Sequence, residues 1–157
     1  MLKVIGIGSP FGDDQVGLLL INELRQSEQL HSYLSGELEL LAVDRPGASL
    51  LSLFEGAERV IIIDAVVSGA GLGQLHRWPD STTLESCDSF LSSHGFGLIQ
   101  ALTLGRQLAL LPEQLLVLGV EIDPVATGAD LSPMLGQQLP ILIDLVIEEI
   151  LPLLKSF

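Results

Sequence analysis

The chain has 157 residues, of which 48% are hydrophobic and 17% are charged, and its formal net charge is −13 at pH 7. This length supports one sizeable hydrophobic core, so we expect a single domain over residues 1–157. Binding to nucleic acid or to anionic lipid depends on Lys and Arg. The chain has only 7 of these against 20 acidic residues, which excludes both classes of partner. A cationic ligand, a metal ion or a basic peptide suits such a surface, although acidic surfaces also serve solubility alone.

No segment has the pattern of a membrane span or of a secretion signal. The two most hydrophobic stretches, residues 60–67 and 139–154, are short or interrupted by acidic residues. The N-terminal run MLKVIGIGSPFGDD leads into a Gly/Pro turn and two acids instead of a cleavage site. The single cysteine, Cys87, cannot form an internal disulfide. We therefore expect a cytoplasmic protein, with a monomer as its simplest state.

In the first half of the chain, short apolar runs that end at Gly or Asp alternate with segments of helical spacing. This alternation predicts an α/β fold, a single-domain three-layer sandwich in which a twisted, mostly parallel sheet has helices on both faces. The strand at 58–64 is the most apolar, so we expect it at the centre of the sheet. The other predicted elements are, in chain order, a strand at 2–8, a helix at 15–28 with Val16, Leu19, Leu20 and Leu24 on one face, a strand at 37–43, a turn at 44–47 and a short helix at 48–54.

In the second half, glycines at 69–73 break the pattern before a polar and apolar alternation resumes. Pro140 in the closing helix predicts a kink or a restart, because proline cannot donate the helical hydrogen bond. No internal repeat or linker marks a domain boundary. The predicted elements are a short edge strand at 74–78, a polar surface loop at 79–93, a helix at 94–110, a last strand at 114–122 and a helix at 132–154.

Side chains that can bind a metal follow three of the apolar runs. Asp13 and Asp14 come after the first strand, Asp64 ends the central strand, and His94 opens the helix that follows the polar loop. In parallel α/β sheets, ligands bind beyond the carboxyl ends of the strands. If the strand order is 2-1-3, Asp14 and Asp64 emerge side by side. Two carboxylates and one imidazole form an incomplete shell for nickel, zinc, cobalt or manganese, with positions open for water or a substrate group.

A purely structural role explains some of these residues better than others. Asp14 suits the N-terminus of a helix, where the macrodipole favours an acid. Asp64, at the tip of an apolar strand, is poorly placed for solvation unless something binds there. His94 could instead cap the helix that it opens. His31 and His76 are expected to be surface residues.

Three segments resemble the signatures of the nickel-iron hydrogenase maturation endopeptidases. They are GIGSPFGDDQVG at residues 6–17, IIIDAVVSG at 61–69 and SSHGFGL at 92–98. The three segments occur in the same order as in the family, and the distances between them along the chain are about the same. With LGVEIDP at 118–124 and the closing amphipathic helix, the resemblance covers nearly the whole chain.

The resemblance implies an endopeptidase that removes the C-terminal extension of a hydrogenase large-subunit precursor after nickel insertion. The metal-binding and catalytic positions of the family match Asp14, Asp64 and His94. The nickel is implied to come with the precursor, held by its cysteine thiolates, so the enzyme carries no catalytic metal of its own. No Ser-His-acid set is identifiable, and one hypothesis is that the shared ion polarises water or the scissile carbonyl as a Lewis acid.

Two positions differ from the family pattern. Ser9 stands where the family usually has Asn, and the loop from Gly8 to Gly17 is one residue shorter than is common. The shortening leaves Asp13 as an alternative ligand to Asp14. The distance from Asp14 to Gly17 matches the family, which favours Asp14.

Three other functions share part of this pattern. A signalling receiver domain also has an acid pair after strand one and an Asp at the end of strand three, but it needs a lysine after its last strand, where residues 117–124 here are VLGVEIDP. A dinucleotide-binding domain would use Gly6, Gly8 and Gly12, but their spacing is not Gly-x-Gly-x-x-Gly, and Asp13 and Asp14 would face the pyrophosphate. The third alternative is a non-enzymatic nickel-binding maturation factor.

Overall fold

The computed structural model describes residues 1–80, 97–123 and 128–156. These form one five-stranded sheet with the strand order β2-β1-β3-β5-β4. All neighbouring strands are parallel except β4, which runs antiparallel to β5 at one edge. The α/β fold, the mostly parallel sheet, the 2-1-3 order and the short edge strand are therefore confirmed. The strands are β1 (Leu2–Gly8), β2 (Leu38–Asp44), β3 (Arg59–Val66), β4 (Leu75–Trp78) and β5 (Gln114–Glu121).

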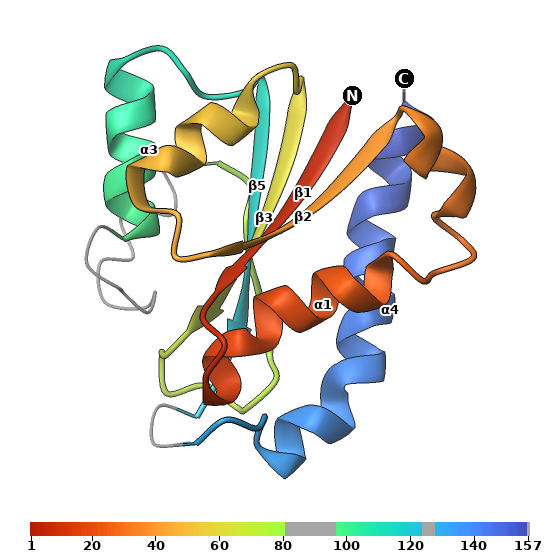
Figure 1. Cartoon of the computed structure of the whole chain (residues 1–157), viewed down its shortest axis with the longest axis vertical. Coiled ribbons are helices and arrows are strands. Elements are labelled where there is room, and N and C mark those ends of the chain that lie inside the picture. Colours follow the sequence, from red (N-terminus) through yellow and green to blue (C-terminus); the bar gives the residue numbers. More distant parts are fainter. Residues whose placement is uncertain (81–96, 124–127, 157) are drawn as a thin grey trace.

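Helices cover both faces of the sheet (Figure 1). On one face, α1 (Val16–Leu24) and α4 (Pro133–Lys155) pack with the strands into a first hydrophobic cluster. On the other face, the 3-10 helix η3 (Gly47–Phe54) and α3 (Leu98–Gln107) form a second cluster. Two more 3-10 helices, η1 (Gly12–Gln15) and η2 (His31–Ser35), lie before and after α1. None of the helices in the described part of the chain is long and apolar enough to cross a membrane.

Strand β3 lies at the centre because it is buried on both faces. Ile61, Ile63 and Ala65 belong to the cluster under α1 and α4, whereas Ile62 and Val66 belong to the cluster under η3 and α3. Each fully buried Ile or Val side chain stabilises the fold by about 1.5–3 kcal/mol. A strand that faces two layers of helices needs apolar residues at successive positions, which explains its composition.

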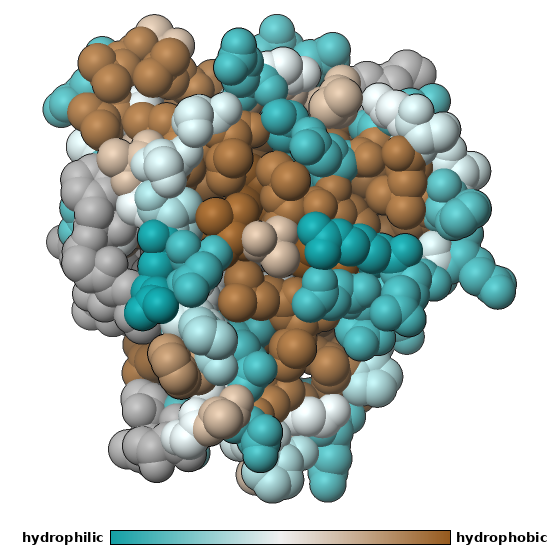
Figure 2. Space-filling model, viewed as in Figure 1, coloured by the Kyte–Doolittle hydropathy of each residue, from teal (hydrophilic) through white to brown (hydrophobic). Residues whose placement is uncertain are grey.

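Hydrophobic residues also remain at the surface, as Figure 2 shows in the middle of the face drawn there. Phe11, Met134 and Ile141 are each about 60% exposed. A chain with a mean hydropathy of +0.52 has too few polar residues to cover its whole surface, so single exposed apolar residues are expected.

Several element boundaries differ from the prediction. Helix α1 ends at Leu24, where Gln26 and Ser27 form tighter hydrogen bonds to residues three positions earlier, and Leu19 is partly exposed. The predicted helix at 48–54 is a 3-10 helix that starts at Gly47. Strand β3 continues to Val66, so Asp64 lies two residues before the end of the strand.

Helix α4 continues through Pro140 without a restart. Because Pro140 has no N–H, the carbonyl of Gly136 loses its helical hydrogen bond. Both residues are exposed, so water can satisfy that carbonyl. The start of the predicted helix at 94–110 and most of the predicted loop at 79–93 lie outside the described residues; α3 itself begins at Leu98.

The first turn of α1 is in backbone contact with the sheet. A Cβ atom added to Gly17 would lie 2.3 Å from the carbonyl oxygen of Ile7, and one added to Gly6 would lie 2.2 Å from the carbonyl oxygen of Gly17. Real Cβ atoms do not approach backbone atoms so closely, so both positions require glycine. This contact fixes the short segment between β1 and α1, which contains Asp13 and Asp14.

We predict that Gly17→Ala destabilises the protein by at least about 2 kcal/mol, because the added methyl group must separate α1 from β1. Gly136→Ala is the matched control, since Gly136 is also helical but has no atom within 4 Å of the added Cβ. It should gain about 0.5–1 kcal/mol from helix propensity. Urea unfolding followed by circular dichroism measures both. Equal effects of the two substitutions would show that the contact at Gly17 does not constrain the fold.

Candidate functional site

The carboxyl ends of β1 and β3 bring two of the predicted site residues together. Because β1 pairs with β3, the segment after β1 that carries Asp14 lies next to the end of β3, where Asp64 is located. Asp64 alternates along β3 with Ile62 and Val66, so its side chain points to the face that α3 and η3 cover. The two carboxylates interact electrostatically, since the charge on Asp14 raises the pKa of Asp64.

Asp64 is a buried acid with little to stabilise its charge. Only 4% of the residue is exposed, and the backbone N–H of Ala65 donates one hydrogen bond of 2.8 Å to Oδ1. Burial raises the pKa of Asp64 well above 3.8, the repulsion from Asp14 raises it further, and the bond from Ala65 lowers it only in part. A cation beside Asp64 would reverse this balance. The site therefore has the electrostatics of a cation-binding position.

The neighbouring acid, Asp13, has a structural role. Its Oδ1 accepts a hydrogen bond from the backbone N–H of Ser132 at 2.6 Å, and its Oδ2 accepts bonds from the Ser132 hydroxyl at 2.9 Å and from the N–H of Asp123 at 3.2 Å. Asp13 is 1% exposed. It thus ties the end of β5 and the start of α4 to η1. With both of its oxygens occupied in this way, Asp13 holds segments of the fold together and is not the ligand of the pair.

Arg45 lies at the rim of the same site and was not identified from the sequence. It follows β2 with a φ of 40°, and its N–H donates to the carbonyl of Gly8 at 3.0 Å. The hydrogen bond to Asp44 raises the pKa of Arg45, and the charges of Asp44 and Asp14 raise it further. The charge of Asp14 therefore acts both on a buried acid, Asp64, and on the guanidinium of Arg45. The only signal in the sequence was the DRPG turn at the carboxyl end of a strand.

His94, the third predicted ligand, lies outside the described residues. Within residues 1–80, 97–123 and 128–156, no three His, Cys, Asp or Glu side chains are grouped closely enough to hold a metal. Helix α3, which begins four residues after His94, packs on the face of the sheet to which Asp64 points. The convergence of all three ligands stays a prediction.

A second polar cluster, which the sequence did not predict, lies on the same face. Glu121 is 2% exposed and accepts hydrogen bonds from the N–H and the hydroxyl of Ser68 and from Nε2 of His76, the last at 3.0 Å. Burial would raise the pKa of Glu121, but the bonds from Ser68 and His76 lower it overall. His76, also expected at the surface, lies on the edge strand β4 and is partly buried, with 21% of its side chain exposed. His31 is exposed, as expected.

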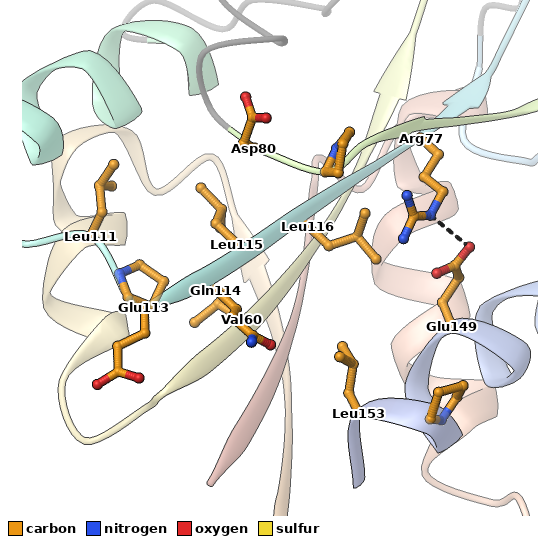
Figure 3. A pocket seen from close by; sticks show the side chains of 13 residues that line it. Val60, Arg77, Asp80, Leu111, Glu113, Gln114, Leu115, Leu116, Glu149 and Leu153 are labelled. Carbon is orange, nitrogen blue, oxygen red and sulfur yellow. Dashed lines mark hydrogen bonds and ion pairs between the residues drawn. The ribbon is translucent and has the colours of Figure 1, made fainter. Parts of the chain in front are cut away.

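A cavity of about 560 Å³ lies at the opposite end of the sheet. It is lined by the first residues of β3 and β5, including Val60 and Gln114, and by Arg77, which forms an ion pair of 3.0 Å with Glu149 at its edge (Figure 3). Neither Asp14 nor Asp64 lines it. The candidate site is therefore separate from this cavity.

Comparison with known proteins identifies relatives of this chain. The family model for hydrogenase maturation proteases, HycI, matches residues 24–149. No curated protein matches significantly.

Three of the similar solved structures are maturation enzymes, and at these identities they show the fold alone. The hydrogenase maturating endopeptidase HybD from E. coli has a TM-score of 0.73 and 21% identity, over 94% of this chain and 90% of that chain. The [NiFe] hydrogenase maturation protease HybD from Thermococcus kodakarensis has a TM-score of 0.72 and 21% identity, over 94% and 97% of the two chains. The [NiFe] hydrogenase maturation protease HycI from Thermococcus kodakarensis KOD1 has a TM-score of 0.69 and 20% identity, over 94% and 90%.

We predict that Asp64→Asn raises the melting temperature at pH 7. The native pKa of Asp64 lies above the ordinary 3.8, so between these two values the folded protein holds a proton that the unfolded chain has lost. Stability falls as pH rises through that interval, and Asn removes this loss. Thermal unfolding from pH 4 to pH 8 should show the variant's advantage growing with pH. A difference in melting temperature that stays the same from pH 4 to pH 8 would contradict a raised pKa of Asp64.

We also predict that the two adjacent acids separate in their effect on stability. Asp13→Ala should cost at least about 3 kcal/mol, because three hydrogen bonds to a buried carboxylate are lost. Asp14→Ala, the matched control, should cost less than Asp13→Ala, because Asp14 is only partly buried. Urea unfolding of both variants measures the difference. A larger loss of stability for Asp14→Ala than for Asp13→Ala would show that Asp14, and not Asp13, has the structural role.

Proposed function

Because this chain belongs to the hydrogenase maturation protease family, we propose that it removes the C-terminal extension of a nickel-iron hydrogenase large-subunit precursor after nickel has been inserted. The chain is thus a protease, and its proposed substrate is a protein. The observation that carries the proposal is the pair of carboxylates at the carboxyl ends of β1 and β3, of which Asp64 is buried and disfavoured as an anion.

The donor atoms present suit a divalent transition ion that the substrate brings. Asp14 and Asp64 supply carboxylate oxygens, and His94 is proposed as the imidazole ligand. Three ligands leave positions for the thiolates that hold nickel in the precursor. Since the site binds the ion only together with those thiolates, its affinity for the precursor depends on whether nickel is present.

The buried carboxyl of Asp64 makes this recognition selective. Without a cation, burial and Asp14 favour its protonated form. A nickel ion nearby lowers the pKa of Asp64, so the proton leaves and the carboxylate binds the ion. In the proposed mechanism, Asp14, Asp64 and His94 hold the nickel of the precursor against the peptide to be cut, and the shared ion polarises water or the scissile carbonyl.

The family assignment decides against the receiver-domain and dinucleotide-binding alternatives. The segment after β5 has no lysine in the position that a receiver requires. Asp13 and Asp14 occupy the first turn before α1, where they would repel a pyrophosphate. A nickel-binding factor without protease activity is the alternative that the activity assay addresses.

We predict that nickel-loaded precursor incubated with this protein loses mass at its C-terminus, as measured by intact-protein mass spectrometry. Asp14→Asn, Asp64→Asn and His94→Ala should each reduce the rate by more than about 100-fold while circular dichroism stays native, because each replacement removes a proposed metal ligand without adding volume. Precursor that binds but keeps its full mass with wild-type enzyme would support the non-enzymatic alternative.

The source of the metal gives a separate prediction. Enzyme treated with chelator and then desalted should process nickel-loaded precursor at an unchanged rate, and nickel-free precursor should stay uncut. Mass spectrometry of the two mixtures measures both results. Inactive chelator-treated enzyme that recovers on addition of zinc would identify a conventional metallopeptidase instead.

A further inference from the structure

The cluster of Ser68, Glu121 and His76 is not used by the proposed cleavage chemistry. Its carboxylate is almost fully buried and receives donors from two other segments, the residues that follow β3 and the start of β4. Burying an ionised carboxylate is costly unless it is paired and hydrogen-bonded. A cluster of this kind at the substrate-binding end of an α/β sheet needs an explanation beyond packing.

The cluster and Asp64 share one face and one end of the sheet. Leu115 and Val117 of β5 pack under η3 and α3, so by strand alternation Glu121 points to that face as well. Trp78 of β4 belongs to the same cluster, which places His76 on this face too.

The register sets the separation between His76 and Asp64. Asp64 pairs with Gly119, and Gly119 pairs with His76, so the three residues form one row across β3, β5 and β4. Adjacent strands are about 4.8 Å apart, which places His76 about 10 Å from Asp64 along this row. An extended peptide covers that distance with about three residues. The middle position is a glycine, and the ring of Trp78 lies over it.

The imidazole of His76 is held in a defined orientation. Its Nε2 bonds to Glu121, and its ring stacks on Trp78 with centroids 5.7 Å apart and an interplanar angle of 20°. Within the described part of the chain, Nδ1 of His76 has no hydrogen-bond partner. A carboxylate that binds one ring nitrogen fixes the direction and the tautomer of the other.

From this arrangement we infer that His76 is a substrate-binding residue, whose Nδ1 hydrogen-bonds the peptide chain of the precursor about three residues away from the position held at Asp64. Glu121 and Ser68 are the positioning residues that hold the imidazole. This inference rests on the proposed function for the identity of the peptide. The negative charge of Glu121 compensates any positive charge on His76. The partner of Nδ1 in the peptide can therefore be a backbone group or a polar side chain and need not be charged.

The experiment measures kcat and KM for processing of nickel-loaded precursor by wild-type enzyme, His76→Phe and His76→Gln. Phenylalanine keeps a ring on Trp78 but has no nitrogen, so KM should rise about tenfold, the effect of one lost hydrogen bond, with kcat unchanged. Glutamine can donate to Glu121 and still bond the peptide, so it should restore KM to within about threefold of wild type. His31→Phe is the control, since His31 is exposed and lies in η2, away from this face.

An unchanged KM for His76→Phe, or a glutamine variant that behaves like phenylalanine, would overturn the inference while leaving the proposed function intact. If wild-type enzyme leaves the precursor uncut, the proposed function fails, and the same mixtures then give Kd by calorimetry. A tenfold weaker Kd for His76→Phe, with rescue by glutamine, would still support the subsite. Absence of binding by wild-type enzyme would reject both proposals. If His76→Phe does not fold, His76→Gln and His76→Ala are compared instead. A KM within about threefold of wild type for His76→Gln, with a KM about tenfold higher for His76→Ala, would support the subsite. Equal KM values for His76→Gln and His76→Ala would reject it.

Discussion

The structure depends on the direct contact between the first turn of α1 and the strands β1 and β3. Gly17 lies against the carbonyl oxygens of Ile7 and Ile63, and Gly6 faces Gly17 from the strand side. No side chain separates the helix from the sheet here, so the segment between them has little freedom. This segment is η1, and the contact therefore determines where Asp13 and Asp14 point.

From this fixed segment, two adjacent acids act in opposite directions. Asp13 turns inward and binds Asp123 and Ser132, which joins the ends of β5 and α4 to the first loop. The charge of Asp14 raises the pKa of both Asp64 and Arg45. One acid stabilises the carboxyl end of the sheet, and the other adds negative charge near the buried Asp64.

The same end of the sheet also carries Glu121, a buried acid with the opposite electrostatic environment. Asp64 has one hydrogen bond and a raised pKa, whereas Glu121 has three donors and a lowered pKa. The bonds from Ser68 and His76 lower the pKa of Glu121 against the effect of burial, whereas Asp64 has only the bond from Ala65 to oppose that effect. Asp64 is therefore disfavoured as an anion, whereas Glu121 is stabilised as the carboxylate that holds His76.

The sequence alone determined the fold class, the central position of β3, the edge strand at β4 and the family, because these follow from local hydrophobic pattern, turn residues and short motifs. It also identified Asp14 and Asp64 as neighbours, since the 2-1-3 strand order makes the ends of β1 and β3 adjacent. The structural role of Asp13, the position of Arg45 and the bond between His76 and Glu121 were decided only by the tertiary structure. Each of these depends on contacts between segments more than 30 residues apart in the chain, such as the 110 positions between Asp13 and Asp123 and the 45 between His76 and Glu121. Local pattern carries no information on such pairs, because their side chains meet only after strands from distant parts of the chain have joined one sheet.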